Sequence, residues 1–148
     1  MTTPQAGLQL EAALQTLRDR RYRITPARRE ILHILTHEHG PFSAEDLQSR
    51  IEGADLVTVY RTLAMLDKTG LARRCDFGDG AYRYEFNTGD AHHHHVICRA
   101  CGKVEIVAPC LSEPLDRFAE KMGYAEVTHT LEFFGICPAC QKQPPPLA

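Results

Sequence analysis

Apolar residues in the first half of the chain repeat at helical spacing. Residues 8–20 carry one such stripe, which predicts an amphipathic helix. A second helix is expected to begin at Thr25-Pro26, because threonine caps helices well and proline suits the first helical position. Gly40-Pro41 should end that helix, and Ser43 is a good cap for a short third one.

A fourth helix is predicted from about residue 56 to residue 68, with Gly70 as its stop. Its apolar positions share one face: Leu56, Val59, Leu63 and Leu66. Two β-prone runs follow, and the Gly-Asp-Gly between them predicts a hairpin over residues 72–77 and 81–86. Short helices followed by a two-stranded ribbon are typical of a winged helix-turn-helix, whose recognition helix enters the major groove.

The second half of the chain is more strand-like. Residues 87–91 are polar and turn-prone, which favours a hinge, and the proline-rich end from about residue 142 predicts a disordered tail. Between these lie three expected strands and one helix, over residues 93–97, 104–107, 126–134 and 111–122. We therefore predict an α+β chain made of a winged-helix domain (1–86), the hinge, and a small C-terminal α/β domain (92–148).

Composition and charge limit the binding partners and the cellular compartment that can be expected for the protein. The chain has 148 residues and a formal net charge of −2. The basic residues of the first half cluster over residues 18–29, which suits phosphate neutralisation but equally a solvated helix face. The sequence contains neither an apolar stretch that could span a membrane nor a signal peptide. A cytoplasmic protein without a membrane partner is expected.

Two Cys-x-x-Cys pairs, Cys98/Cys101 and Cys137/Cys140, carry the clearest chemistry. Cysteines at this spacing on a tight turn can both bind one tetrahedral ion, and two such pairs complete a four-cysteine site. Four protein ligands leave no open position for catalysis, so a structural Zn²⁺ is predicted. The alternative is a pair of redox-active dithiols or disulfides.

Four consecutive histidines, residues 92–95, precede the first cysteine pair. If this run is a strand, alternate side chains point to opposite sides of the sheet. His93 and His95 would then serve one metal site, and His92 and His94 another.

The chain resembles the ferric uptake regulator family, bacterial metal-activated repressors, over roughly residues 8–140. Five segments carry the resemblance in order: Arg-Ile-Thr-Pro-Ala-Arg (23–28), Ser-Ala-Glu-Asp-Leu (43–47), Thr-Val-Tyr-Arg-Thr-Leu (58–63), His-His-His-His-Val-Ile-Cys-Arg-Ala-Cys-Gly-Lys (92–103) and Cys-Pro-Ala-Cys (137–140). The resemblance implies a winged-helix DNA reader joined to a dimerisation domain, and structural zinc on the four cysteines. It also implies a sensory metal near the hinge that closes a homodimer onto a palindromic operator, usually of metal-uptake genes.

The resemblance places five residues at the DNA. Tyr60 and Arg61 match the family's recognition helix, where arginine can contact guanine or phosphate and an aromatic ring can pack on thymine methyl groups. Arg23 and Arg28 match basic positions near the backbone or minor groove, and Thr58 matches a phosphate contact. The alternative for the Tyr-Arg pair is a capping salt bridge and a half-buried tyrosine.

For the sensory metal, the resemblance suggests ligands from both domains: Glu85, His93, His95 and Glu105. The family's histidine from the DNA-binding domain falls on Pro41 here. His39, or else His37, would have to supply that ligand from a different loop.

For a second metal, the family pattern suggests two histidines of the run, an acidic residue of the following helix and a histidine of the last strand: His92, His94, Glu113 and His129. Depending on where the alignment is anchored, either Glu113 or Ser112 occupies the acidic position.

Two further cysteines, Cys75 and Cys110, read as small buried hydrophobes, as free cysteines usually are. Alternatively, Cys75 joins the sensory site.

A thiolate in the sensory site would favour zinc, whereas histidines with carboxylates suit Fe²⁺ or Mn²⁺. Zinc is slightly favoured over Fe²⁺ as the sensed metal, which suggests the zinc-uptake branch of the family. A manganese-responsive or peroxide-responsive regulator is the alternative.

Two other classes fit the sequence less well. A metalloenzyme would need a general base and an open coordination position, and no such motif accompanies the histidine run. A zinc-buffering or redox-switch protein would hold Cys98 and Cys101 in a disulfide. The prediction is a non-enzymatic, homodimeric, metal-dependent repressor.

Overall fold

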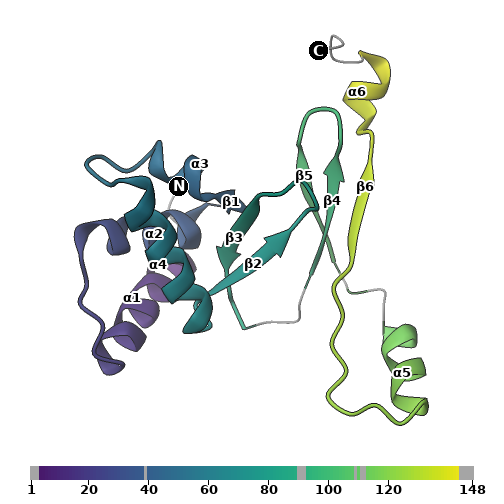
Figure 1. Cartoon of the computed structure of the whole chain (residues 1–148), viewed down its shortest axis with the longest axis horizontal. Coiled ribbons are helices and arrows are strands. Elements are labelled where there is room, and N and C mark those ends of the chain that lie inside the picture. The colour runs from purple at the N-terminus through teal and green to yellow at the C-terminus, as the bar shows by residue number, and fades with distance from the viewer. Residues whose placement is uncertain (1–3, 39, 90–92, 109, 111–112, 144–148) are drawn as a thin grey trace. The chain divides into compact units, whose positions relative to one another are not determined.

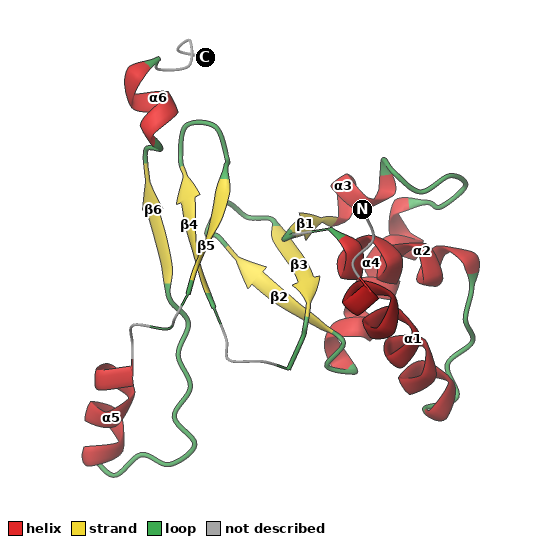
Figure 2. Cartoon of the chain, turned by 180° about the vertical axis from the view of Figure 1, so that it is seen from behind, coloured by secondary structure: helices red, strands yellow, loops and turns green. Residues whose placement is uncertain are grey.

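The computed structural model describes residues 4–38, 40–89, 93–108, 110 and 113–143. The chain divides into two compact units, Met1–Thr88 and Gly89–Ala148. Both units combine helices with a small sheet, so the predicted α+β class is confirmed (Figure 2). No helix in the described part of the chain is long and apolar enough to cross a membrane.

In the first unit a short edge strand lies between two pairs of helices in the chain, and a hairpin follows the second pair (Figure 1). Its elements are α1 (Pro4–Asp19), α2 (Pro26–His37), β1 (Phe42–Ser43), α3 (Ala44–Gln48), α4 (Leu56–Lys68), β2 (Ala72–Asp76) and β3 (Tyr82–Phe86). The strands form an antiparallel sheet in the order β1-β3-β2. The two-residue strand β1 was not predicted, because its pairing with β3 is not a local sequence signal.

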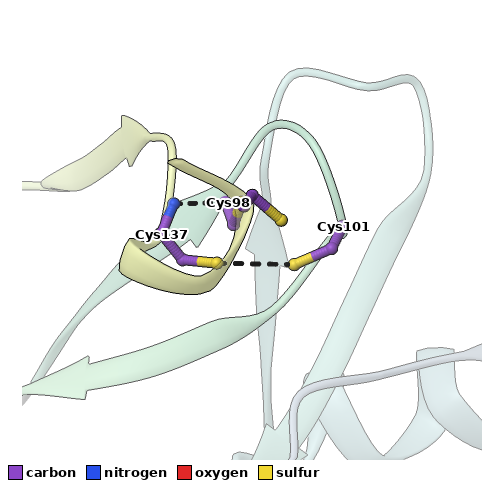
Figure 3. A group of neighbouring side chains, drawn as sticks. Cys98, Cys101 and Cys137 are labelled. Atoms are coloured by element: carbon purple, nitrogen blue, oxygen red, sulfur yellow. Dashed lines mark hydrogen bonds between the residues drawn. The ribbon is translucent and has the colours of Figure 1, made fainter. Parts of the chain in front are cut away.

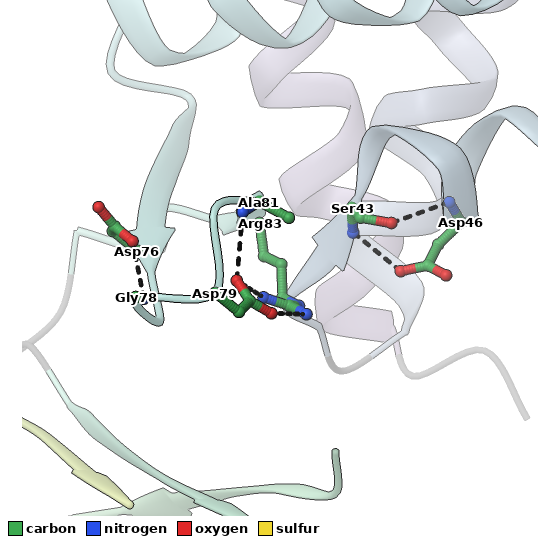
Figure 4. Close-up of polar contacts among 7 residues, drawn as sticks. All are labelled: Ser43, Asp46, Asp76, Gly78, Asp79, Ala81 and Arg83. Atoms are coloured by element: carbon green, nitrogen blue, oxygen red, sulfur yellow. Dashed lines mark hydrogen bonds and ion pairs between the residues drawn. The ribbon is translucent and has the colours of Figure 1, made fainter. Parts of the chain in front are cut away.

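Local capping fixes where these helices begin. Thr25 Oγ1 accepts a hydrogen bond from the N–H of Arg28 at 3.3 Å, with proline in the first turn of α2 as predicted. At α3, Ser43 Oγ accepts from the N–H of Asp46 at 3.1 Å, and the carboxylate of Asp46 accepts from the N–H of Ser43 at 2.9 Å (Figure 4). Such caps are typically worth about 1 kcal/mol.

The core of the first unit orients α4. Val59, Leu63 and Leu66 are fully buried, and the partly buried Leu56 packs against the same cluster, as the predicted stripe requires. Since this stripe belongs to the core cluster, which also contains side chains of α2 and α3, the opposite side of α4 faces solvent. Thr58, Tyr60 and Arg61 lie on that exposed side.

The turn between β2 and β3 is held by its own side chains. Gly78 and Gly80 have φ angles of +72° and +82°, a region that favours glycine. Asp79 Oδ1 accepts from the N–H of Ala81 at 3.2 Å, and the Arg83 guanidinium donates to both oxygens of Asp79 at 3.1 and 2.7 Å (Figure 4). These bonds to the charged form lower the pKa of Asp79 to about 2.

The second unit is built on a three-stranded sheet in the order β5-β4-β6. Its elements are β4 (His94–Cys98), β5 (Val104–Val107), α5 (Glu113–Lys121), β6 (Glu132–Gly135) and α6 (Pro138–Lys142). The central strand β4 is antiparallel to β5 and parallel to β6. The predicted strand over 126–134 was too long: pairing with the short β4 begins only at Glu132, and Glu126 has a φ of +54° that extended strands do not adopt.

Few apolar side chains are buried in the second unit. In its described residues only Ile97 and Cys98 belong to the buried apolar set, whereas the first unit has a full core. Many large apolar side chains are instead exposed: Ile106, Leu115, Phe118, Met122, Tyr124, Phe133, Phe134 and Ile136. A unit of this kind needs a metal or a partner to be stable. The last part of the predicted tail, residues 144–148, lies outside the described residues.

Candidate metal centres and nucleic-acid interface

The four cysteines of the two Cys-x-x-Cys pairs converge from the two ends of the second unit. Their sulfur atoms all lie within 4.8 Å of one another. Cys101 Sγ and Cys137 Sγ are 3.8 Å apart (Figure 3), and a tetrahedral ion with Zn–S bonds of about 2.3 Å has edges of about 3.8 Å. Gly102, with φ +73°, closes the first turn, and Pro138 starts α6 inside the second. The donor set therefore fits Zn²⁺.

The thiols of this group do not ionise alike. The N–H of Cys137 donates to Cys98 Sγ at 3.3 Å, and this bond is the largest cause of a pKa lowered to about 6 for Cys98. Hydrogen bonding with Cys137 and Cys101 raises the pKa of Cys140 to about 12. Four crowded sulfurs cannot all be thiolates unless a cation compensates their charge, and a bound divalent metal does so. None of the six cysteines forms a disulfide in the structure.

Two of the residues predicted for the second metal lie together. His94 Nε2 and His129 Nε2 are 3.2 Å apart, although 35 positions separate them in the chain. Cys110 Sγ lies 3.1 Å from the first nitrogen and 3.4 Å from the second. His92 is outside the described residues, and so is the side chain of Glu113 at the start of α5.

Of the two histidines predicted for the sensory metal, His95 lies next to an acidic residue that was not predicted from the sequence. The rings of His93 and His95 meet edge to face with centroids 5.1 Å apart, and His95 is buried. His95 Nδ1 lies 3.3 Å from Glu132 Oε2. A carboxylate in this position can orient the imidazole so that Nε2 is available to a metal.

Glu105 is not brought to these histidines. In the sheet it is opposite Val96, while His95 is opposite Ile106 and Glu132. Directly paired residues share a face and neighbours along a strand alternate, so Glu105 and His95 point to opposite faces. Glu105 is exposed and its carboxylate accepts from Lys103 Nζ at 2.8 Å. The register of β5 therefore contradicts its predicted role beside His95.

Cys75 and Glu85 lie on adjacent strands of the first unit's sheet. One ligand atom of each lies within 4.8 Å of the other, and both residues are buried. Arg73 Nη1 is 3.7 Å from Glu85 Oε1, which partly balances the buried carboxylate. Cys75 is thus buried as either sequence interpretation requires, and its carboxylate neighbour makes it a candidate ligand. His39 lies outside the described residues.

The exposed side of α4 carries the predicted DNA contacts. Asp55 caps the helix by accepting from the N–H of Thr58 at 2.6 Å. The Tyr60 hydroxyl donates to Glu45 Oε1 at 2.9 Å, which ties α4 to α3 and raises the pKa of Tyr60. Arg61 is exposed one residue further along.

The basic cluster of residues 18–29 is partly occupied by contacts within the first unit. Arg20 donates to the carbonyl of Thr69 at 3.1 Å, and Arg28 donates to the carbonyl of Arg23 at 2.6 Å. Arg23 is exposed and Arg28 partly buried. The cluster therefore combines structural hydrogen bonds with exposed charge.

Residues 19–134 match the model of the ferric uptake regulator family. The chain belongs to the ferric uptake regulator family. It is 35% identical to the peroxide operon regulator of Bacillus subtilis, over 93% of this chain and 97% of that protein. It is 36% identical to the ferric uptake regulation protein of Synechococcus elongatus, over 96% of this chain and 98% of that protein.

The fold agrees with solved members of the ferric uptake regulator family. The ferric uptake regulator of Vibrio cholerae aligns with a TM-score of 0.72 at 30% identity, over 83% of this chain and 98% of that one. This chain is thus a metal-responsive regulator of that family, with a winged-helix unit followed by a metal-binding unit.

Three residues near the candidate metal centres were not predicted from the sequence. Cys110 was grouped with buried hydrophobes, and Asp116 and Glu132 were not considered. Asp116 could have been noticed as an acidic residue one turn after Glu113 in the same predicted helix. The places of Cys110 and Glu132 depend on how the second unit folds, so no local pattern identifies them.

Proposed function

We propose that this protein is a cytoplasmic, homodimeric repressor that binds a palindromic operator of metal-uptake genes when its regulatory metal is bound. The observation that carries the proposal is the exposed Thr58–Tyr60–Arg61 side of α4, presented by a winged-helix unit in a chain that also holds clusters of metal-binding side chains. The proposed contacts to DNA are those of this helix together with Arg23 and Arg28.

The proposal of a homodimer is supported by the surface of the second unit. The α5 side chains Leu115 and Phe118, and Met122 just after them, follow helical spacing and are 62–67% exposed. Strand β6 is an edge of its sheet and carries the exposed Phe133 and Phe134. Apolar surface of this extent next to a free sheet edge is the kind that a second copy covers.

Zinc stays the slightly favoured regulatory metal, with Fe²⁺ next and Mn²⁺ as a further candidate. Cys75 and Glu85, with His93 and His95, are the proposed ligands of the sensory metal. The thiol of Cys75 beside a carboxylate supports zinc, because thiolates favour softer ions than Mn²⁺. His92, His94, Glu113 and His129 stay the proposed ligands of the second metal.

Operator binding should depend on a metal other than the structural zinc. Purified protein that retains its four-cysteine zinc would be used to select duplexes from a random DNA library, anaerobically, at buffered free Zn²⁺, Fe²⁺ or Mn²⁺. We expect an inverted repeat to be enriched only when a regulatory metal is present, because the metal favours the DNA-binding conformation. The metal that works at its normal intracellular level identifies the signal. Equal enrichment with a weak chelator in place of metal would overturn the proposal.

A peroxide-responsive regulator is the second candidate, favoured by the 35% identity to the peroxide operon regulator of Bacillus subtilis. In that case the Fe²⁺-loaded protein should lose operator binding after brief exposure to hydrogen peroxide, and a thiol reductant should not restore it. Mass spectrometry should then find an added oxygen on a peptide containing His93 or His95. Full recovery with the reductant, or no loss at all, would count against this candidate. The Zn²⁺-loaded protein is the matched control.

A further inference from the structure

The cluster of His94, Cys110 and His129 has a composition that the family pattern did not predict. The three residues belong to β4, to the connection between β5 and α5, and to the segment before β6. Their ligand atoms form a triangle with sides of 3.2 Å between the two Nε2 atoms, and 3.1 and 3.4 Å from these to Cys110 Sγ. His94 is buried and the other two are partly buried.

Hydrogen bonds at the other ring nitrogens fix both imidazoles. His94 Nδ1 lies 3.0 Å from the carbonyl oxygen of Leu131, which can only accept. His129 Nδ1 lies 2.8 Å from Asp116 Oδ1, a carboxylate that also accepts when ionised. A neutral ring with its proton on Nδ1 satisfies each of these acceptors and directs the lone pair of Nε2 into the triangle.

With this tautomer the two Nε2 lone pairs face each other at 3.2 Å, an arrangement that a positive centre between them stabilises. The S–H of Cys110 can be donated to one of these two nitrogens at a time. A metal ion relieves this arrangement for all three groups at once. Tetrahedral zinc with usual bond lengths has edges of about 3.3 Å between nitrogens and about 3.6 Å between nitrogen and sulfur, close to the observed triangle.

We propose that Cys110 supplies a thiolate to this second metal site, so that its described ligands are His94, His129 and a thiolate, a set selective for Zn²⁺. On binding, the metal–sulfur bond forms as the S–H proton of Cys110 is released to solvent. Two imidazoles and a thiolate suit zinc or cobalt far better than Mn²⁺, which prefers oxygen ligands. Asp116 is a positioning residue, since it holds His129 in the orientation and tautomer that the metal needs.

Cobalt spectroscopy tests this site without reference to DNA. The full-length Cys75→Ser protein, with one zinc per chain retained in the four-cysteine site, is titrated anaerobically with Co²⁺. The Cys75→Ser background removes the one other thiol outside the four-cysteine site. We expect a near-ultraviolet sulfur-to-cobalt charge-transfer band with intense visible bands typical of tetrahedral cobalt, and loss of the charge-transfer band in Cys75→Ser/Cys110→Ser. Zinc content measured after titration verifies that cobalt has not entered the four-cysteine site.

A second variant separates coordination from a merely structural role of the cluster. Asp116→Asn should keep the charge-transfer band, because the thiolate ligand is unchanged, but should weaken Zn²⁺ affinity at this site about 10- to 100-fold. Affinity is measured by competition with a chromophoric chelator, and circular dichroism checks the fold. A cobalt-loaded Cys75→Ser protein without the charge-transfer band would overturn the proposal. So would a band of unchanged intensity in the folded Cys110→Ser double variant.

Discussion

Replacing Cys101 with serine should remove the structural zinc and, with it, the folded second unit and the dimer. Loss of one thiolate leaves three sulfurs within 4.8 Å of one another and no closed tetrahedral shell. Zinc binding of this type contributes on the order of 10–16 kcal/mol in small zinc domains. The described part of the second unit buries only Ile97 and Cys98 as apolar residues, so it has little else to hold it together.

The first unit gives this experiment an internal standard. Its apolar core lies between Leu10 and Tyr84, all within Met1–Thr88, so most of the helical circular dichroism should survive in Cys101→Ser. Zinc is measured by elemental analysis and the mass in solution by light scattering. Cys75→Ser makes the same chemical change outside the four-cysteine site and should retain one structural zinc and the dimer. A dimeric Cys101→Ser protein with full zinc would show that the site is not structural.

Replacing Arg61 with alanine should abolish operator binding while leaving zinc content and stability unchanged. Arg61 is exposed on the outer side of α4, opposite the buried stripe of Val59, Leu63 and Leu66. A guanidinium that contacts guanine is worth about 1–3 kcal/mol in each half-site. In a symmetric dimer the loss occurs twice, which corresponds to roughly 30-fold to 10⁴-fold weaker binding.

Lys68→Ala is the matched control for Arg61→Ala. It removes the same charge from an exposed position at the other end of α4, and its binding should stay close to that of the wild type. Affinity is measured by fluorescence anisotropy over a range of salt concentrations. If Arg61 reads a base, the variant should also lose preference at one operator position. If it binds phosphate, binding to all sequences should weaken and the salt slope should fall by about 1 for each half-site, or about 2 for the dimer. Normal binding by Arg61→Ala would reject α4 as the recognition helix.

Local signals in the sequence were enough to predict much of the fold. The caps Thr25 and Ser43, the bounds of α4 and the hairpin turn all depend on residues a few positions apart, and each has the predicted geometry. The two Cys-x-x-Cys pairs are equally local, because each places two sulfurs on one turn whatever the surrounding fold. The alternation of the histidine run along a strand likewise follows from β geometry.

The ligand sets of the second unit depended instead on contacts between distant segments. Glu105 follows the histidine run in the sequence, but the register of β5 turns it to the other face of the sheet. A shift of one residue in strand register reverses every side chain, and no local pattern sets that register in so short a strand. The carboxylate beside His95 comes from Glu132, on the parallel strand β6.

What the sequence by itself determined is therefore the winged-helix unit, the family and the four-cysteine site, because these follow from short-range motifs and helical periodicity. What only the tertiary structure decided is which side chains join the remaining metal centres. In the sequence Cys110 cannot be distinguished from an ordinary buried cysteine. The chain path between β5 and α5 nevertheless places its sulfur 3.1 Å from His94 Nε2 and 3.4 Å from His129 Nε2. Such convergence comes from packing of segments up to 35 positions apart, which propensity and spacing cannot encode.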